Sequence, residues 1–558
     1  MRSTSETRRL PVAGRNGAVA AGSQAAADAG AAVLADGGNA VDAIIAAALM
    51  AYVVEPGMAG LAGHGRMAIY WAATGTTTAI DHFIRAPALA TPDRYREALE
   101  RAGGDVRAIH HAGVLSVGVF GTAVGLAAAH DHFATRDLAA LAAPAVARAR
   151  DGIPVDLDVQ QGIIGRQAEL EHHALARDFL MPGGRLPALS DGLGGGGRLD
   201  GRDLAGTLER FGKNGASAVH AGAVADAIDR LMRREGGLLR ADDLARYTPA
   251  IGEDPRYRFA GGEISTCGDL IAVETLNILS ALDLAGHAAG SAGALHLFAE
   301  AQALAFADSY AHAGDPADGA TPMAGLTSAA YGRERAALVR NDAALGHYDP
   351  GDPWVHEGRP PPVLPEKSGR PAALVGTTRL CAADREGNVV TFITSLGSSF
   401  GSLVRVPGTG LFPGNAMKWF DPRPGRINSV APGRMPVYGA PALIAYRAGR
   451  ACGAIAGAGG FRIQSAVLQT LLNHVVHGQD LQAAVESPRI FHDGSRLELD
   501  GRAGPHVAAA LAALGHDLVV VPEVVGRRAF ARPAAVWRDD DGLFHAASDP
   551  VAGGAAVI

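Results

Sequence analysis

The sequence has little of several things that would point to particular classes of protein. Only 3 of its 558 residues are cysteine, and Cys267, Cys381 and Cys452 lie too far apart to form a CxxC metal-binding pair. We expect them to be buried, reduced thiols. Lys and Arg number 50 against 57 Asp and Glu, so the net charge of -7 gives no basic surface for nucleic acid or an anionic membrane. A small-molecule or peptide substrate fits this composition better.

Long apolar segments are also missing. The longest one, Ala43 to Val54, is too short to span a bilayer, and Asp42 stands at its edge. We therefore expect it to be a core helix and expect no contact with a membrane. The chain begins MRSTSETRRLPVAGRNGAVAAG, in which the positive charges are followed by no apolar stretch of the kind found in secretory signals. This predicts a cytoplasmic protein, with a periplasmic location less favoured.

Several widespread catalytic and binding patterns do not occur. The sequence contains neither a GxSxG nucleophile elbow nor an HExxH metal motif. His110-His111 and His172-His173 are adjacent pairs, whose side chains point in different directions. The glycine-bearing stretch Gly60 to Gly65 follows a predicted helix and lacks the phosphate-binding pattern G-x-x-x-x-G-K-S/T. We therefore expect no metal, no cofactor and no nucleotide.

The apolar content is sufficient for a large folded core, since hydrophobic residues make up 48% of the chain and charged residues 19%. Near the start, Ser23 to Ala35 is Ala-rich and predicts a helix that Gly37 and Gly38 end. Asn39 is a good N-cap for a second helix, and Met67 to Trp71 has the composition of a strand. The sequence thus indicates two short helices in series, followed by a loop and a strand.

The character of the chain changes near residue 371. From Asp349 to Pro371 it is dense in Pro, Gly and charge, which is typical of an exposed loop or linker. Beyond it, Thr378 to Ala383 and Val389 to Thr394 are strand-like and joined by a short turn, which predicts a β-hairpin. Farther on, Arg462 to His477 has an apolar helical face, with a glycine pair just before it and Gly478 as its stop.

The hairpin begins a series of motifs that follow one another in a fixed order: GTTRLCAADREGNVVTFITSLGSSFGS, GTGLFPGNAMKWF, PGRMPVYGAP, AGAGGFRIQSAVLQTLLN, ESPRIFH and ASDPVAGGAA. Earlier segments belong to the same series, including DGGNAVDA, GVFGTAVGL and GGLLRADDLARY. Together these motifs resemble the γ-glutamyltransferase family in order and spacing, over nearly the whole chain.

The resemblance implies an α+β fold, a four-layer αββα sandwich of the N-terminal-nucleophile hydrolase type. It also implies self-cleavage between Gly376 and Thr377 into a large chain, 1 to 376, and a small chain, 377 to 558, which stay together as one folded unit. The chemistry is coherent, because a threonine hydroxyl needs a base beside it and a freed α-amino group can be that base. Thr377 would then serve as both nucleophile and base.

The resemblance assigns further catalytic roles. Gly459 and Gly460 match the glycine pair that holds the oxyanion, and their place at a helix N-terminus adds favourable amide dipoles. Ser395 falls where the family has a hydroxyl beside the nucleophile, which it would orient by a hydrogen bond. The plainer alternatives are a loop glycine pair and an ordinary strand serine.

The residues that bind the γ-glutamyl group in the family appear here in altered form. Phe83 stands where an arginine is expected, Val437 and Tyr438 replace a serine pair, Trp419 replaces an aspartate and Gly397 an asparagine. A charged ammonium group is costly to bury without a carboxylate partner. Efficient γ-glutamyl transfer is therefore not expected, and a substrate without the α-amino group is favoured.

Glutaryl is such an acyl group, and the chain resembles the branch of the family that removes glutaryl from 7-aminocephalosporanic acid. Arg85 and Arg434 are the candidates for holding a terminal carboxylate, although each also fits a structural role. The leading hypothesis is thus an acylase for short dicarboxylic acyl groups, with weak γ-glutamyl transfer. The alternatives are a γ-glutamyltransferase or hydrolase, a hydrolase of a small amide such as oxamate or of a carbon–carbon bond, and an unprocessed, non-catalytic binding homologue.

Overall fold

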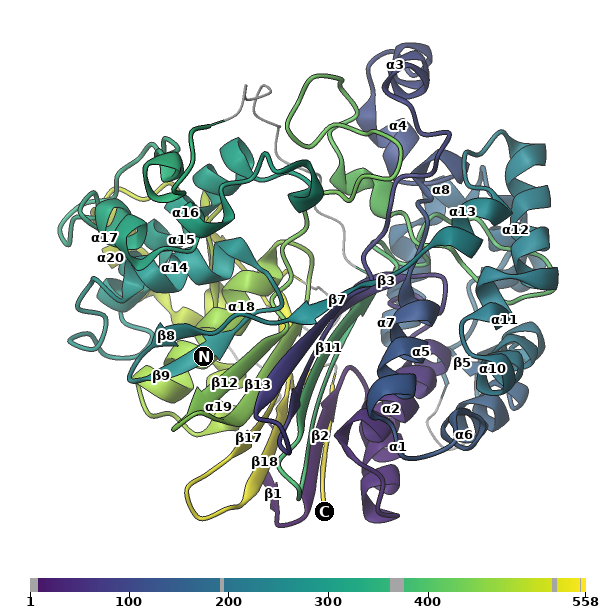
Figure 1. Cartoon of the computed structure of the whole chain (residues 1–558), viewed down its shortest axis with the longest axis horizontal. Helices are drawn as coiled ribbons and strands as arrows, with labels where there is room; N and C mark the ends of the chain where they lie inside the picture. Colours follow the sequence, from purple (N-terminus) through teal and green to yellow (C-terminus); the bar gives the residue numbers. More distant parts are fainter. Residues whose placement is uncertain (1–8, 191–194, 362–375, 524–528, 552) are drawn as a thin grey trace.

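Two antiparallel β-sheets pack face to face in the middle of the molecule (Figure 1). The computed structural model describes residues 9–190, 195–361, 376–523, 529–551 and 553–558. Within these residues, one seven-stranded sheet has the order β19-β2-β10-β11-β3-β4-β7 and the other the order β1-β18-β17-β13-β12-β9-β8. Strands β10 and β11 of the first sheet contact β13 of the second, so the hairpin predicted from the sequence lies against the facing sheet.

The strands of the first sheet are β19 (Gly554–Val557), β2 (Gly17–Ala21), β10 (Thr377–Asp384), β11 (Val389–Ser395), β3 (His64–Trp71), β4 (Thr76–Asp81) and β7 (Ala250–Glu253). Those of the second are β1 (Val12–Gly14), β18 (Phe544–Ser548), β17 (Arg532–Arg538), β13 (Arg450–Ala458), β12 (Leu443–Arg447), β9 (Gly262–Ser265) and β8 (Tyr257–Phe259). Small additional sheets join β14 (Ile490–Phe491), β15 (Leu497–Asp500) and β16 (Leu518–Val521), and β5 (Ile153–Pro154) with β6 (Arg198–Leu199).

Helices cover the outer face of each sheet. On the first sheet, α1 (Gln24–Ala35) contacts β2 and β19, and α2 (Ala40–Val54) contacts β10 and β11. On the second, α18 (Arg462–Leu471) contacts β13 and β17, while α14 (Leu270–Leu279) and α15 (Ala292–His312) pack together beyond it. Figure 1 shows these helix groups on opposite sides of the sheets. The predicted four-layer αββα arrangement is therefore confirmed.

The remaining helices lie around these layers. They are α3 (Pro92–Arg101), α4 (Val106–His110), α5 (Thr122–Phe133), α6 (Leu138–Arg150), α7 (Leu157–Gly165), α8 (Gln167–Leu170), α9 (Ala174–Leu180), α10 (Arg202–Asn214), α11 (Ser217–His220), α12 (Gly222–Glu235), α13 (Ala241–Arg246), α16 (Met323–Leu326), α17 (Ala329–Ala336), α19 (Leu481–Glu486) and α20 (Pro505–Ala513). Among the described residues, no helix combines the length and the apolar character needed to cross a membrane.

The first two helices form as their sequence predicts. The Ser23 side chain caps α1, and the Asn39 side chain accepts hydrogen bonds from the first turn of α2, where Asp42 completes a capping box. Every residue of α2 is buried, which explains why its apolar residues cover the whole circumference instead of one face. The prediction of a core helix here is confirmed.

The helix predicted from Arg462 to His477 is regular only as far as Leu471. Its last part, Leu472–Val476, continues as a wider π-helical turn, η6. The predicted linker from Asp349 to Pro371 is described as far as residue 361, with a short 3-10 turn, η4 (Pro353–His356), and its remainder lies outside the described residues. The cysteines are free thiols, of which Cys267 and Cys381 are buried and Cys452 is half-buried.

Candidate active site

The predicted nucleophile lies at the end of the hairpin. Thr377 is the first residue of β10 and pairs with Ser395, the last residue of β11, in antiparallel register. Both side chains are buried. The β-branched and apolar residues of both strands favour this hairpin, so that local sequence brings the two hydroxyls to the same end of the hairpin.

The two hydroxyls and the preceding carbonyl form a connected hydrogen-bond network. Thr377 Oγ1 lies 3.0 Å from Ser395 Oγ, and Ser395 Oγ donates to the carbonyl oxygen of Gly376 at 2.7 Å. The same carbonyl accepts hydrogen bonds from the backbone N–H groups of Leu396 at 3.0 Å and Gly397 at 3.2 Å. Three donors therefore converge on the carbonyl of the predicted cleavage site, which is the arrangement that stabilises an oxyanion.

Only glycine fits immediately before Thr377. A Cβ atom built on Gly376 would overlap the backbone carbonyl of Ser398. Gly397 is constrained as well, because its φ of 89° is left-handed and a Cβ there would overlap Asn415 Oδ1. Close packing of backbone on both sides thus holds the Gly376 carbonyl in place.

A buried ionic cluster lies beside strand β10. Asp549, in the ASDP segment, lies 3.1 Å from Arg489 and 4.0 Å from Arg532. Burial alone would raise the pKa of Asp549, but Arg489, Arg532 and Arg379 together hold it below its ordinary value. Arg379 is the third residue of β10, so this cluster fixes the strand that carries the nucleophile.

The glycine pair Gly459-Gly460 lies between β13 and α18, as predicted. Both residues have positive φ, 154° and 63°, and a Cβ on Gly459 would overlap Ala531. The carbonyls of the pair accept hydrogen bonds from Arg462 and Ile463, which begin α18. The oxyanion role assigned to this pair remains a prediction, and its glycines are required by the backbone in any case.

Several predicted substrate-binding residues lie together. Phe83, which follows β4, stacks on Tyr438 with ring centroids 4.6 Å apart and an interplanar angle of 18°. Trp419, at the end of the short helix η5 (Ala416–Trp419), lies 4.9 Å from Tyr438 and 5.0 Å from Phe461, the residue after the glycine pair. These four residues, Phe83, Trp419, Tyr438 and Phe461, form a packed cluster of buried side chains, which we call the aromatic pocket.

The aromatic pocket adjoins the nucleophile through Tyr438. Burial raises the pKa of the Tyr438 hydroxyl, and an interaction with Thr377 opposes that rise, so the two hydroxyls are close. Val437 is half-buried and donates its N–H to Asn428 Oδ1 at 3.0 Å, beside a small cavity that Tyr438 and Met435 also line. The structure therefore places Tyr438, one of the two residues predicted to replace the serine pair, near Thr377.

Arg85 and Arg434, the candidates for binding a carboxylate, each have an acidic partner in the protein. Arg85 lies 3.4 Å from Asp315, and Arg434 is paired with Asp318. Arg434 also donates to the carbonyls of Ser429 and Ile427, both at 3.0 Å. An acyl carboxylate would have to compete with these partners.

His64 is a site residue that the sequence did not reveal. It lies on β3 directly opposite Ser395 of β11, is fully buried, and packs edge-on against Phe83 at 4.6 Å. Burial, followed by the charges of Lys418 and His82, lowers the pKa of His64 well below its ordinary value, so the ring is neutral. Within the described part of the chain, neither of its ring nitrogens has a hydrogen-bond partner.

Lys418 is a second residue that the sequence left unnoticed. Its buried amine donates to the Gly397 carbonyl at 2.7 Å and to Ser398 Oγ at 3.1 Å, and it lies 4.9 Å from the centre of the Trp419 ring. Burial and the nearby charge of Arg166 lower its pKa well below the ordinary value. Lys418 thus links the aromatic pocket to the loop whose N–H groups donate to the Gly376 carbonyl.

Comparisons with known proteins identify the family of the chain. The family model described as Gamma-glutamyltranspeptidase matches residues 26–558. The chain is 34% identical to the Acylase ACY 1 proenzyme of Pseudomonas sp. (strain V22), over 95% of this chain and 93% of that protein. It is 31% identical to the glutathione hydrolase proenzyme of Bacillus subtilis (strain 168), over 98% and 92% of the two chains.

A solved structure extends the likeness to three dimensions. The cephalosporin acylase from Bacillus halodurans is 26% identical and superimposes with a TM-score of 0.84, covering 99% of this chain and 98% of that one. The fold is therefore that of the N-terminal-nucleophile hydrolases. The chain belongs to the gamma-glutamyltranspeptidase family and is an acylase-like hydrolase within it, which confirms the resemblance seen in its motifs.

Proposed function

We propose that this chain is a proenzyme that cuts itself between Gly376 and Thr377 and then hydrolyses the amide of a short dicarboxylic acyl group such as glutaryl. The observation that carries the proposal is the Gly376 carbonyl, which accepts three hydrogen bonds beside the hydroxyl that would attack it. The products are chains of residues 1–376 and 377–558, which stay associated because each contributes strands to both sheets. A cytoplasmic location is part of the proposal.

The self-cleavage step uses the network around Gly376. Thr377 Oγ attacks the Gly376 carbonyl carbon, and the developing oxyanion is held by Ser395 Oγ and the N–H groups of Leu396 and Gly397. The carbon–nitrogen bond then breaks, which leaves the Gly376 acyl group on Thr377 Oγ as an ester and frees the α-amino group of Thr377. One water molecule hydrolyses the ester, giving the Gly376 carboxylate and restoring the hydroxyl.

The acylase step repeats this chemistry on an external amide. The freed amine, whose ordinary pKa is about 7.7 to 8.0, takes the proton as Thr377 Oγ attacks the substrate carbonyl. Gly459 and Gly460 are the proposed donors to the new oxyanion. The amine of the substrate leaves with a proton, and water or an acceptor amine then releases the acyl group from Thr377.

The aromatic pocket supports the choice of acyl group. Trp419 and Phe83 supply apolar area where a γ-glutamyl group needs a carboxylate and an arginine, so that the pocket suits an acyl chain without an α-amino group. The indole N–H of Trp419 has no hydrogen-bond partner among the described residues, and neither does His64. We assign these two groups to the terminal carboxylate of the acyl chain, since Arg85 and Arg434 would first have to leave Asp315 and Asp318.

The proposal is tested by a denaturing gel with N-terminal sequencing, followed by assays on two anilides. We expect two bands, the smaller beginning at Thr377, and hydrolysis of glutaryl-anilide at least about 10-fold faster than that of γ-glutamyl-anilide, as expected if the buried ammonium lacks a partner worth about 1.4 kcal/mol or more. A persistent single band would favour the non-catalytic binding homologue. Preference for the γ-glutamyl probe would favour a γ-glutamyltransferase, and activity on neither would point to a smaller amide such as oxamate or to a carbon–carbon bond.

A further inference from the structure

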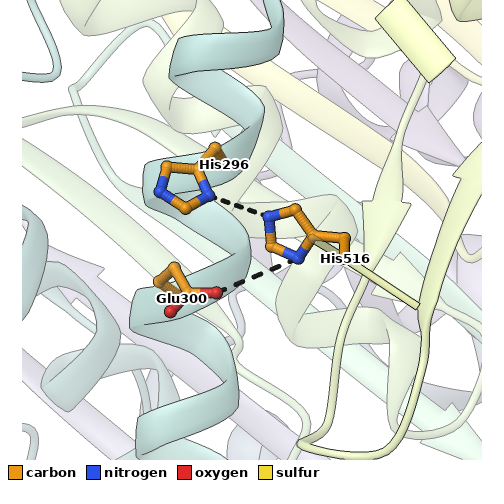
Figure 2. A group of neighbouring side chains, drawn as sticks. All are labelled: His296, Glu300 and His516. Atoms are coloured by element: carbon orange, nitrogen blue, oxygen red, sulfur yellow. Dashed lines mark hydrogen bonds and ion pairs between the residues drawn. The ribbon is translucent and has the colours of Figure 1, made fainter. Parts of the chain in front are cut away.

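A second group of buried ionisable side chains lies outside the active site. His296 and Glu300 are one turn apart on α15, and His516 lies between α20 and β16. Figure 2 shows the three side chains turned toward one another. All three are buried, and they offer one ligand atom each within 4.8 Å of the other two. Imidazole nitrogen and carboxylate oxygen are common ligands of transition metals.

The position of the proton on His296 follows from its partners. Its Nε2 lies 2.6 Å from the carbonyl oxygen of Arg340, which can only accept, so Nε2 carries the proton. Its Nδ1 therefore offers a lone pair toward His516 Nε2, at 2.8 Å. A backbone carbonyl that accepts from the outer nitrogen is the usual way in which a metal-binding histidine is oriented.

Glu300 is oriented in a comparable way. Its Oε1 accepts a hydrogen bond from the Tyr348 hydroxyl at 2.7 Å, and its Oε2 accepts one from the Leu345 N–H at 3.1 Å. Hydrogen bonds of this kind fix the carboxylate that binds a metal. The carboxylate is thus held against α15 with oxygen lone pairs directed toward His516.

His516 lies between the other two residues. In its contact with the His296 lone pair, its Nε2 must supply the proton, so the Nδ1 of the neutral ring carries a lone pair. This Nδ1 lies 3.9 Å from Glu300 Oε1 and has no hydrogen-bond partner in the described part of the chain. The Nδ1 lone pair of a neutral His516 ring and the Glu300 carboxylate would therefore face each other. A cation between these groups would convert the repulsion into attraction.

We propose that His296, Glu300 and His516 bind a divalent transition-metal ion of the Zn²⁺ class, with water completing the coordination. Zn²⁺ bonds to these ligands are about 2.0 to 2.2 Å long, so tetrahedral donors lie about 3.3 to 3.6 Å apart. One ligand atom of each side chain lies within 4.8 Å of the other two, so modest side-chain rotations would bring the three donors to that spacing. Two imidazoles with one carboxylate favour Zn²⁺ over Mg²⁺ or Ca²⁺, which prefer oxygen ligands only.

The site would join the two parts of the chain. His296 and Glu300 belong to residues 1–376 and His516 to residues 377–558, so an ion bound by all three connects the two chains after cleavage. This consequence depends on the proposed cleavage, whereas binding of the ion depends on the fold alone. The cluster has no signature in the sequence, because His296 and His516 are 220 residues apart and form no local motif.

Zinc binding can be counted directly on protein made without a histidine tag. The protein is stripped with a chelator, dialysed against Zn²⁺ and analysed for bound metal by mass spectrometry. We expect one ion per protein molecule in the cleaved wild type and in the uncleaved Thr377→Ala, and none in Glu300→Gln or His516→Ala. His172→Ala, at an exposed histidine, is the matched control and should keep the ion. Co²⁺ should give the visible absorption of a tetrahedral site in the wild type, Thr377→Ala and His172→Ala, but not in Glu300→Gln or His516→Ala.

The two loss variants are also checked for folding by circular dichroism. Glu300→Gln keeps the size of the side chain and an oxygen that can accept from Tyr348, so it remains informative if His516→Ala does not fold. Wild-type protein that retains no zinc, or Glu300→Gln that binds as much as wild type, would overturn the proposal. Failure of cleavage would appear separately, as a single band on the gel with zinc still bound.

Discussion

The end of the β10–β11 hairpin and the aromatic pocket beside it use their polar groups in opposite ways. At the hairpin, Ser395 and the backbone of Leu396 and Gly397 all donate to one carbonyl, so the polar groups are paired before any substrate arrives. In the pocket, the Trp419 indole N–H, and beside it the ring of His64, are buried without hydrogen-bond partners among the described residues. Buried polar groups normally find a partner in the protein, so those that do not are candidates for binding a ligand.

The difference separates two stages of function. A network that is already complete serves a reaction within the chain, whereas groups without partners serve a reaction that needs a second molecule. Self-cleavage is therefore expected to be sensitive to the hairpin alone, and the choice of substrate to the pocket. The predictions below test that separation, from the largest expected effect to the smallest.

Replacing Thr377 with Ala should abolish both stages. The variant lacks the hydroxyl that attacks Gly376 and the substrate, so we expect no cleavage and a loss of amidase activity of about 10⁴-fold or more, as seen when an enzyme loses its nucleophile. A gel and an anilide assay measure the two effects. Thr377→Ser retains a hydroxyl and should still cleave; a Thr377→Ala protein that cleaves would remove the basis of the proposed function.

Replacing Ser395 with Ala should slow self-cleavage by about 10²- to 10³-fold, the usual effect of removing one donor from an oxyanion site. The reason is the 2.7 Å hydrogen bond from Ser395 Oγ to the Gly376 carbonyl. The rate is followed on gels after purification of the fresh precursor. Thr394→Val, one position before Ser395 on β11, is the control and should cleave at nearly the wild-type rate. Equal rates for the two variants would contradict the assignment of Ser395.

Replacing Asp549 with Asn should lower the free energy of unfolding by about 3 to 5 kcal/mol at neutral pH, because the buried Arg489 and Arg532 lose the carboxylate that they share. The pKa of Asp549 is lower in the folded state than in the unfolded chain, so its contribution is complete above the unfolded pKa and is lost as pH falls through the folded pKa. The gap between wild type and variant should therefore shrink below about pH 4. Urea unfolding at several pH values measures it, and a constant gap would refute this account.

Replacing Trp419 with Phe should act on substrate binding and leave cleavage unchanged. Phe keeps most of the apolar surface and removes the N–H assigned to the acyl carboxylate, so we expect KM for glutaryl-anilide to rise about 5- to 10-fold with little change in kcat. Arg85→Met is the matched variant for the competing assignment. If Arg85→Met raises KM strongly and Trp419→Phe does not, the arginine binds the carboxylate. The claim that polar groups without partners in the pocket bind the substrate would then be wrong.

The sequence predicts the hairpin better than the pocket for a physical reason. Asn39 with Asp42, and Thr377 with Ser395, depend on capping and on strand register, which act over short distances in sequence. The place of Phe83, Trp419 and Tyr438 was inferred from the family's motifs, but their stacking was not. His64 and Lys418 escaped notice because their roles arise from burial against residues that only the tertiary fold brings near.

Cys267 provides the smallest expected effect, since it belongs to neither region. Its side chain is buried, its thiol donates to the Met67 carbonyl at 3.6 Å, and burial raises its pKa well above the ordinary value, which makes it unreactive. Cys267→Ser keeps a donor for the same carbonyl, so the free energy of unfolding should fall by no more than about 1 kcal/mol and both cleavage and KM should stay unchanged. Urea unfolding and the anilide assay check these values. A loss of activity without a loss of stability would mean that the active site extends beyond the hairpin and the pocket to the strand ends around Cys267.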